Sequence, residues 1–230
     1  MEKENKKQAS TLLNPAAYKA IGILDSGVGG LTVMQEIYRL LPGESIVYFG
    51  DTARMPYGPR SPEEVRGFTL EIIEFLQTQE IKLLVVACNS ATAAGLPYYQ
   101  QRTNLPVIGV IEPGVKAALN YTGNGRIGVI GTTGTINSSA YQTALKNHRP
   151  DLHVISRACP LFVLLVENDL VDSPEAERVA REYLDPFCKA GIDTLILGCT
   201  HYPLMSGLIQ QVVGPRVHLV SSASATAGQV

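Results

Sequence analysis

Short apolar runs alternate with longer stretches of helical periodicity along most of this chain. An apolar run of strand length between turn residues is typical of a parallel strand buried on both faces, and the amphipathic stretch after it is typical of a crossover helix. We therefore expect an α/β fold with doubly wound parallel sheets. The strands are expected at residues 20–24, 45–49, 83–87, 106–110, 126–130, 154–156, 194–197 and 217–220. The helices are expected at 29–41, 62–79, from 90 onward, 138–147 and from 174 onward.

Two of the predicted helices begin with a Ser-Pro-Glu sequence. Ser61 has the hydroxyl of an N-cap residue, Pro62 fits the first turn, and Glu64 stands at the capping-box position. The same start recurs at 173–175, in the second half of the chain. We therefore expect a helix to begin at each of these sites.

The pattern of the first half recurs in the second half. The segment 21–27 resembles 127–134, and each leads from an apolar strand into a turn of small residues. A cysteine-bearing turn follows at nearly the same distance in both halves. We infer two similar lobes with a site between them, because small-molecule pockets favour such interfaces. The predicted division is a flexible tail at 1–18, a first lobe at 19–112 with 220–230, and a second lobe at 113–219.

The composition is that of an ordinary globular protein, with 230 residues, 45% hydrophobic, 17% charged and a net charge of −2. A slightly negative net charge does not indicate the basic surface that nucleic-acid-binding proteins have. No apolar stretch approaches the roughly 20 residues of a membrane span. The polar N-terminus lacks the apolar region of a secretory signal, so we expect a cytoplasmic protein. A helix-like segment starts at Ser221 and the chain ends at Val230, and we expect a further helix to belong after it.

Two of the four cysteines each end an apolar run and are followed at once by polar residues. Cys88 and Cys199 therefore stand at the carboxyl ends of predicted parallel strands, where open α/β sheets bind ligands. Two thiols that face one substrate suit a reaction in which one of them removes a proton from one face of a carbon and the other supplies a proton to the opposite face. We expect the helix that follows Cys88 to lower the pKa of that thiol. Cys159 and Cys188 lack this context, and we expect both to be ordinary packing residues.

Polar residues near these strands are candidates for substrate contact. Asp25, in the glycine-rich turn at 25–30, is either a helix cap or a ligand contact, and the turn lacks the spacing of a dinucleotide fingerprint. The loop at 50–58 is either an ordinary turn or a ligand wall that carries Tyr57. No Cys-x-x-Cys pair and no zinc-like Cys/His spacing occurs, so no metal site is predicted. The candidates that adjoin the cysteines are Asn89, Ser90, Thr200 and His201.

Five segments together resemble the signature segments of the glutamate racemases, in the cofactor-independent aspartate/glutamate racemase superfamily. These segments are 22–30, 49–58, 87–93, 127–133 and 197–203, and the resemblance covers about 20–226. It implies two-base racemisation of glutamate that supplies D-glutamate for peptidoglycan, in a cytoplasmic homodimer without a cofactor. No pyridoxal phosphate is expected, because that cofactor needs a Schiff-base lysine and no lysine lies in these motifs.

The resemblance also implies roles for single residues. Cys88 and Cys199 match the two catalytic cysteines, with Cys88 serving D-glutamate and Cys199 serving L-glutamate. Asp25 matches the carboxylate beside the first cysteine, and Glu167 and His201 match the pair near the second. The substrate contacts that the resemblance implies are Asp25, Ser26, Tyr57, Gly58, Asn89, Ser90, Thr132, Thr200 and His201.

The chain departs from the family pattern at two positions. Ser90 stands where the family more often has Thr, which keeps the hydroxyl, and Ser221 stands where Asp is common. Two alternatives stay open at this point: a related racemase acting on aspartate or another small acid, and a two-lobe binding protein without catalysis. The presence of both cysteines argues against the binding protein.

Overall fold

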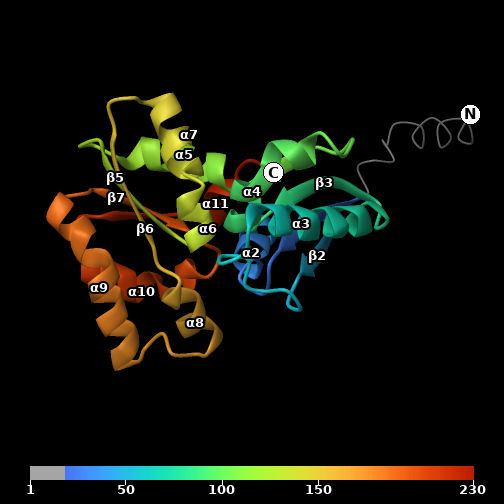
Figure 1. Ribbon diagram of the computed structural model, residues 1–230. Coiled ribbons are helices and arrows are strands. Elements are labelled where there is room, and N and C mark those ends of the chain that lie inside the picture. The colour runs from blue at the N-terminus through green and yellow to red at the C-terminus, as the bar shows by residue number, and fades with distance from the viewer. Residues whose placement is uncertain (1–18) are drawn as a thin grey trace, which may run out of the picture.

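The computed structural model describes residues 19–230 and contains two parallel sheets of four strands each (Figure 1). The first sheet has the order β2-β1-β3-β4, with β1 at Ala20–Asp25, β2 at Ile46–Gly50, β3 at Ile81–Val86 and β4 at Val107–Gly109. The second has the order β6-β5-β7-β8, with β5 at Arg126–Gly131, β6 at His153–Ala158, β7 at Thr194–Gly198 and β8 at His218–Ser221. The predicted α/β fold is confirmed. The segment 1–18, predicted to be a flexible tail, lies outside the described residues.

Helices cover both faces of each sheet, because the strands are apolar on both sides. On the first sheet, α3 (Pro62–Gln77) and α4 (Asn89–Gln100) pack on one face, and α2 (Leu31–Leu40) and α11 (Ser222–Ala227) on the other. On the second sheet, α5 (Ile111–Tyr121) and α7 (Ala140–His148) lie opposite α8 (Leu161–Glu167), α9 (Pro174–Ala190) and α10 (Ser206–Val213) (Figure 1).

The last helix joins the two lobes. It follows β8 of the second sheet, yet Ala223 and Ala227 share an apolar cluster with Ile21 and Val33 beside the first sheet. The last residue of β8, Ser221, caps the helix, since its side chain accepts a hydrogen bond from the amide of Ala223 at 3.2 Å. The chain therefore returns to the first sheet at this point, while the exact lobe boundaries at 112 and 220 stay a prediction.

The predicted helix starts agree with the structure. Ser61 and Glu64 form both hydrogen bonds of the capping box, and Ser173 accepts a bond from the amide of Ala176. The helix predicted at 138–147 is present as α7, which begins two residues later than predicted. A short helix before it, α6 (Thr133–Asn137), was not predicted, and Ser139, which adopts a left-handed conformation with φ of 57°, separates the two.

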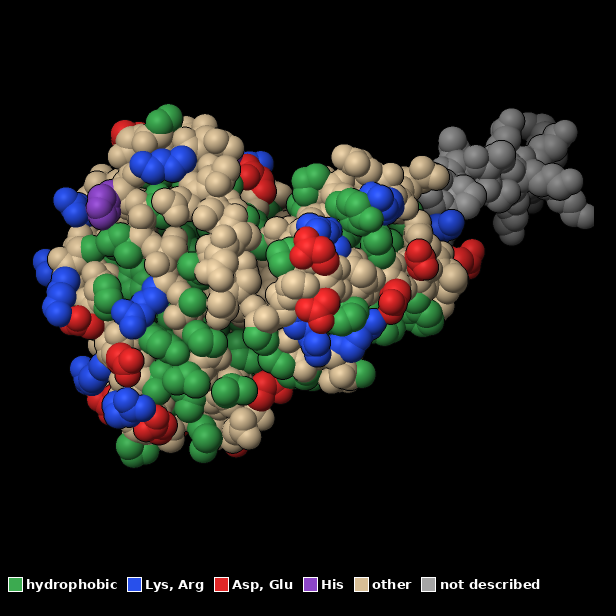
Figure 2. All heavy atoms as spheres, viewed as in Figure 1, with side chains coloured by type: hydrophobic (Ala, Val, Ile, Leu, Met, Phe, Trp, Pro, Cys, Tyr) green, Lys and Arg blue, Asp and Glu red, His purple; other side chains and the backbone are tan. Residues whose placement is uncertain are grey.

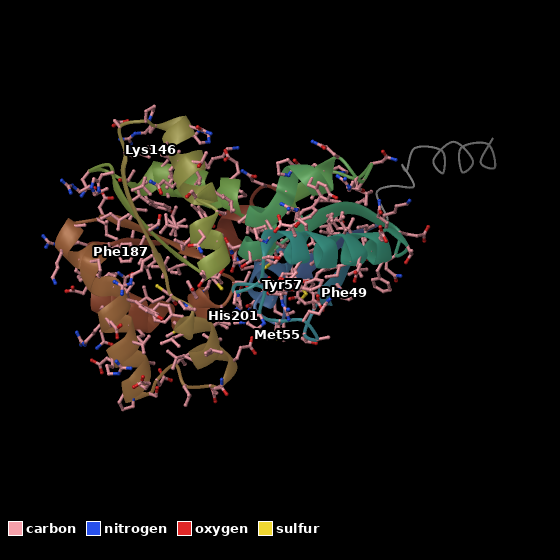
Figure 3. All side chains as sticks on the ribbon, viewed as in Figure 1. Phe49, Met55, Tyr57, Lys146, Phe187 and His201 are labelled. Atoms are coloured by element: carbon pink, nitrogen blue, oxygen red, sulfur yellow. The ribbon has the colours of Figure 1, made fainter. Side chains whose placement is uncertain are left out.

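Within residues 19–230, no helix is both long enough and apolar enough to cross a membrane. The two lobes meet along the carboxyl ends of β1, β3, β5 and β7, and side chains from both lobes gather there. Figure 3 shows His201 of the second lobe close to Met55 and Tyr57 of the first lobe, and these three residues line one cavity.

Candidate active site

Cys88 lies between the end of β3 and the start of α4, and only 4% of its surface is exposed. Its sulfur takes the N-cap role and accepts a hydrogen bond from the amide of Ala91 at 3.4 Å. The expected lowering of its pKa is nevertheless wrong. Burial, and after it the charge of Asp25, raise the pKa of the Cys88 thiol to about 12, because the Ala91 amide opposes the shift only in part.

Cys199 occupies the matching place in the second lobe, directly after β7, with 5% of its surface exposed. Burial raises the pKa of the Cys199 thiol, and the amide of His201 opposes this shift. The charges of Cys88 and Asp25 raise the pKa further, so the two sulfurs lie within electrostatic reach of each other. Burial therefore favours the neutral form of both thiols.

One small cavity brings most of the predicted site residues together. Both cysteines line it, and the walls come from both lobes. The predicted contacts that line it are Ser26, Tyr57, Gly58, Asn89, Ser90, Thr132, Thr200 and His201. Three further residues line the cavity without having been predicted from the sequence: Met55, Pro56 and Val163. Val163 lies on α8, whose unbroken apolar run carries no periodic signal, and Pro56 lies in a loop that the sequence analysis did single out.

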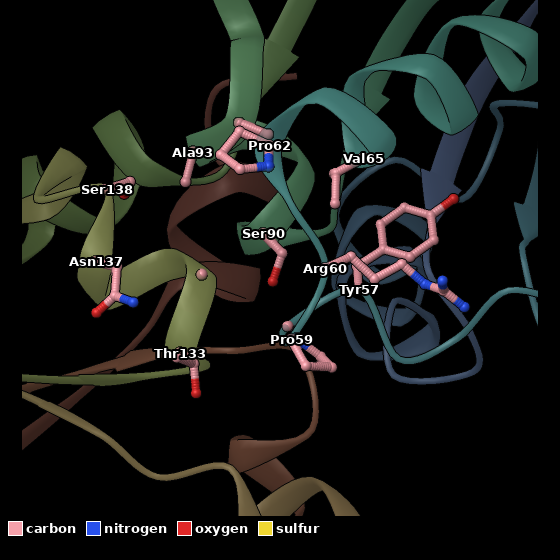
Figure 4. A pocket seen from close by; sticks show the side chains of 13 residues that line it. Tyr57, Pro59, Arg60, Pro62, Val65, Ser90, Ala93, Thr133, Asn137 and Ser138 are labelled. Carbon is pink, nitrogen blue, oxygen red and sulfur yellow. The ribbon is translucent and has the colours of Figure 1, made fainter.

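A wider cavity of about 220 Å³ adjoins the cysteine cavity and shares Tyr57, Gly58 and Ser90 with it (Figure 4). Its other walls come from the loop at 59–60, the start of α3, the middle of α4, and α6 with the residue after it. In Figure 4 the Tyr57 hydroxyl points away from Ser90. The loop that carries Tyr57 and Gly58 therefore separates two hollows at the boundary between the lobes.

Asp25 is completely buried behind this cavity rather than among its lining residues. Its Oδ2 accepts hydrogen bonds from the amides of Gly27 at 3.1 Å and Gly30 at 3.0 Å. Helix α2 begins after Gly30 without a side-chain cap, so Asp25 holds the turn rather than acting as the N-cap residue. Burial raises the pKa of Asp25, while these amides and the nearby His201 oppose the shift.

His201 connects Cys199 to a partly exposed carboxylate. Its Nδ1 lies 3.8 Å from the Cys199 sulfur, and its Nε2 lies 2.5 Å from Oε1 of Glu167. The His201 side chain is 4% exposed and that of Glu167 is 26% exposed. Glu167 is the last residue of α8 and lies outside the lining of the cavity. The chain of contacts thus leads from a buried thiol toward solvent.

The glycine-rich turn of the first lobe packs tightly against the Cys199 loop of the second. A Cβ atom at Gly29 would lie 2.6 Å from both His201 Nδ1 and Thr200 Oγ1. Any larger residue would therefore displace these two side chains. This close approach explains why a glycine stands at the position where the lobes meet.

Tyr57 presents its ring to the cavity, but its hydroxyl is engaged elsewhere. The hydroxyl donates to Oδ2 of Asp51 at 2.5 Å, and the same oxygen accepts from Nε of Arg54 at 2.6 Å. Burial is the main cause that raises the pKa of Tyr57. The Tyr57 ring thus forms a wall of the site, while its hydroxyl is not free to bind a ligand.

Neutral hydrogen-bonding groups from both lobes face each other across the site. The hydroxyls of Ser90 and Thr132 lie 2.9 Å apart, and those of Thr132 and Thr135 lie 3.1 Å apart. In the part of the chain that the structure describes, no lysine or arginine lines the cysteine cavity. The same part has no group of three or more His, Cys, Asp or Glu side chains that could hold a metal ion. The arrangement offers two thiols for proton transfer and neutral donors for an anion.

Comparison with known proteins gives one consistent result. The family model for Asp/Glu/Hydantoin racemase matches residues 21–230. The glutamate racemase of Geobacter metallireducens is 56% identical over 210 residues, which cover 91% of this chain and 78% of that protein. The glutamate racemase of Oceanobacillus iheyensis is 54% identical over 210 residues, which cover 91% of this chain and 77% of that protein.

Solved structures agree. The glutamate racemase isoform RacE1 from Bacillus anthracis matches with a TM-score of 0.90 and 52% identity, over 92% of this chain and 80% of that one. The glutamate racemase from Francisella tularensis, solved in complex with D-glutamate, matches with a TM-score of 0.87 and 38% identity, over 92% of this chain and 79% of that one.

Proposed function

The chain belongs to the Asp/Glu/Hydantoin racemase family, and we propose that it interconverts L-glutamate and D-glutamate by proton transfer between two cysteines. One observation supports this most directly. Cys88 and Cys199 stand at matching strand ends of two lobes and line the same buried cavity. An α-carbon held between them can lose its proton to one sulfur, and the planar carbanion that results can gain a proton from the other sulfur on its opposite face.

In one direction, the Cys199 thiolate takes the α-proton of L-glutamate while the Cys88 thiol protonates the other face, and the reverse direction exchanges these roles. Because burial favours the neutral thiols, each base needs a nearby group that accepts its proton. His201 takes the Cys199 proton at Nδ1 and passes its Nε2 proton to Glu167. Asp25, whose charge acts on Cys88, serves the other thiol.

The proposed substrate fits the neutral lining of the site. Removal of the α-proton places negative charge on the α-carboxylate, and hydroxyl and amide donors stabilise this charge without reorganising. Ser26, Ser90, Thr132, Thr200 and Asn89 supply such donors. The Tyr57 ring and Gly58 close the wall on the side of the first lobe. The side chain of aspartate is one methylene shorter than that of glutamate. With its α-carbon between the two cysteines, aspartate could not bring its side-chain carboxylate to the same hydrogen-bond partners, so we propose that the enzyme prefers glutamate.

The decisive experiment measures α-proton exchange in deuterated water with no added cofactor. Glutamate of either configuration should become deuterated at the α-carbon and racemise, while aspartate should exchange at least about tenfold more slowly. Equal exchange of both amino acids would point to a broader racemase. Binding of glutamate without any exchange would overturn the proposed reaction.

We further propose that the enzyme is a cytoplasmic homodimer that needs no nucleic acid, and that its product enters peptidoglycan. Exposed leucines support a dimer contact near α8, with exposed fractions of 41% at Leu161, 53% at Leu164 and 57% at Leu204. Figure 2 shows hydrophobic side chains gathered where Figure 1 places α8 and α10. Sedimentation of the wild type and of a Leu164→Glu variant tests this proposal, because only the wild type should sediment as a dimer.

A further inference from the structure

The amide of Asn89 has one end bonded and one end free. Asn89 is the first residue of α4, lines the cysteine cavity and is 2% exposed. Its Nδ2 is the one buried side-chain nitrogen or oxygen in residues 19–230 that lacks a hydrogen-bond partner. A buried donor without a partner has lost its hydrogen bonds to water and gained none in return, so it is unfavourable in the free protein. Such a donor at the wall of a ligand cavity points to an acceptor that belongs to the ligand.

The other end of this amide is held by a residue of the second lobe. The hydroxyl of Tyr141, on α7, donates to Oδ1 of Asn89 at 2.7 Å. Turning the amide over would take this acceptor away from the phenol proton. The bond therefore keeps Oδ1 toward Tyr141 and Nδ2 as the free end.

Tyr141 is itself held firmly in place. It is 2% exposed, and a Cβ atom at Gly198, the last residue of β7, would lie 3.0 Å from its ring. A Cβ atom at Gly114 of α5 would lie 3.5 Å from its hydroxyl. Ser222 of α11 lies against the same hydroxyl and forms a hydrogen bond with it. Three elements thus fix the ring, so its hydroxyl has little freedom to leave Asn89.

We propose that Tyr141 is a positioning residue, which orients the Asn89 amide so that Nδ2 donates a hydrogen bond to a carboxylate of the bound amino acid. This inference rests on the proposed function. Because Tyr141 and Asn89 belong to different lobes, the donor is oriented only while the lobes are together. A carboxylate is present both in the substrate and in the transition state, so the bond contributes mainly to substrate binding.

The test is the Tyr141→Phe variant, which removes the hydroxyl and keeps the ring. We expect KM for D- and L-glutamate to rise about tenfold while kcat changes less than about threefold. Tyr99→Phe is the matched control, since Tyr99 is also buried and its hydroxyl donates to the carbonyl of Ala91 in α4 at 3.1 Å, away from Asn89. That variant should keep the wild-type KM. An unchanged KM in Tyr141→Phe would overturn the inference.

A double-mutant cycle separates orientation of Asn89 from a general structural effect. Asn89→Ala should raise KM by itself, and Tyr141→Phe should then add no further increase. A further tenfold increase in the Asn89→Ala background would show that Tyr141 acts by another route. If Tyr141→Phe fails to fold, Asn89→Asp decides the question, because a carboxylate accepts but cannot donate. A wild-type KM in Asn89→Asp would overturn the inference.

The two proposals fail in different ways. A wild-type enzyme that does not racemise glutamate would refute the proposed function. An active wild type whose KM is insensitive to both Tyr141 and Asn89 would refute only the positioning role.

Discussion

Oδ1 of Asp25 accepts a hydrogen bond from the hydroxyl of Thr200 at 3.4 Å, between the two halves of the molecule. Asp25 ends β1 in the first lobe, and Thr200 directly follows Cys199 in the second. The charge of Asp25 also raises the pKa of both Cys88 and Cys199. The groups around the two cysteines therefore form one connected system rather than two independent half-sites.

The first prediction concerns the four cysteines. Cys88→Ser and Cys199→Ser should each lower racemisation by at least about 10²–10⁴-fold, because a hydroxyl is a far weaker acid than a thiol: it gives up its proton poorly and is almost never present as the deprotonated base. Cys159→Ser and Cys188→Ser should keep activity, since neither residue lines the cysteine cavity. Circular dichroism of the glutamate solution measures the rate directly. Wild-type turnover in Cys88→Ser would contradict a two-thiol mechanism.

The part of this site that the sequence predicted is the part set by local pattern. A buried strand can be recognised in the sequence as an apolar run. A residue directly after such a run lies at the carboxyl end of the sheet, whatever the order of the strands in that sheet. The positions of Cys88 and Cys199 follow from this rule. Helices α5, α6, α8 and α10 were not predicted. For α8 the reason is that Leu161–Glu167 is apolar on every side except at its last residue and shows no amphipathic period.

What the sequence could not predict depends on tertiary contacts. The pKa of Cys88 follows burial, which overrides the helix start that we expected to lower it. The Tyr57 hydroxyl is taken by Asp51, a partner that no spacing rule selects. The bond between Asn89 and Tyr141 joins residues 52 positions apart and exists only because the lobes are packed together.

The second prediction uses the close approach of Gly29. In Gly29→Ala the new methyl group would lie 2.6 Å from His201 Nδ1, so the His201 ring must leave its present position beside Cys199. We expect kcat/KM to fall by about 10²-fold, the effect of a misplaced acid–base group. Gly43→Ala is the control, because a Cβ atom there meets nothing within 4 Å and should leave the rate unchanged. Equal activity of the two variants would contradict this account.

The third prediction concerns stability at alkaline pH. Burial raises the pKa of Cys88 and of Cys159 to about 12, above the value of 9.0 for an unperturbed thiol. Between these values the unfolded chain releases protons that the native protein keeps, so the free energy of unfolding must fall as pH rises above about 9. Each thiol contributes a slope of at most about 1.4 kcal/mol per pH unit.

Urea denaturation at pH 8, 9 and 10 measures this slope. The Cys159→Ser variant should show a smaller fall between pH 9 and 10 than the wild type, because serine does not titrate in this range. An unfolding free energy that is constant or rises over the same interval would contradict the buried-thiol explanation.

The last prediction separates the two proton relays. Nδ1 of His201 lies 3.8 Å from Cys199, so His201→Asn should slow mainly the direction in which Cys199 is the base, from L- to D-glutamate. Asp25→Asn removes a negative charge. After burial, this charge is the largest cause of the raised pKa of Cys88, whereas it affects the pKa of Cys199 less. Asp25→Asn should therefore act more on the direction in which Cys88 is the base, from D- to L-glutamate. The ratio of the two kcat/KM values must stay near one, because the enantiomers have equal free energies. The asymmetry must therefore appear in the separate kcat values and in the α-deuterium isotope effects, measured with each enantiomer. Identical isotope effects from D- and L-glutamate in both variants would contradict the assignment of one relay to each cysteine.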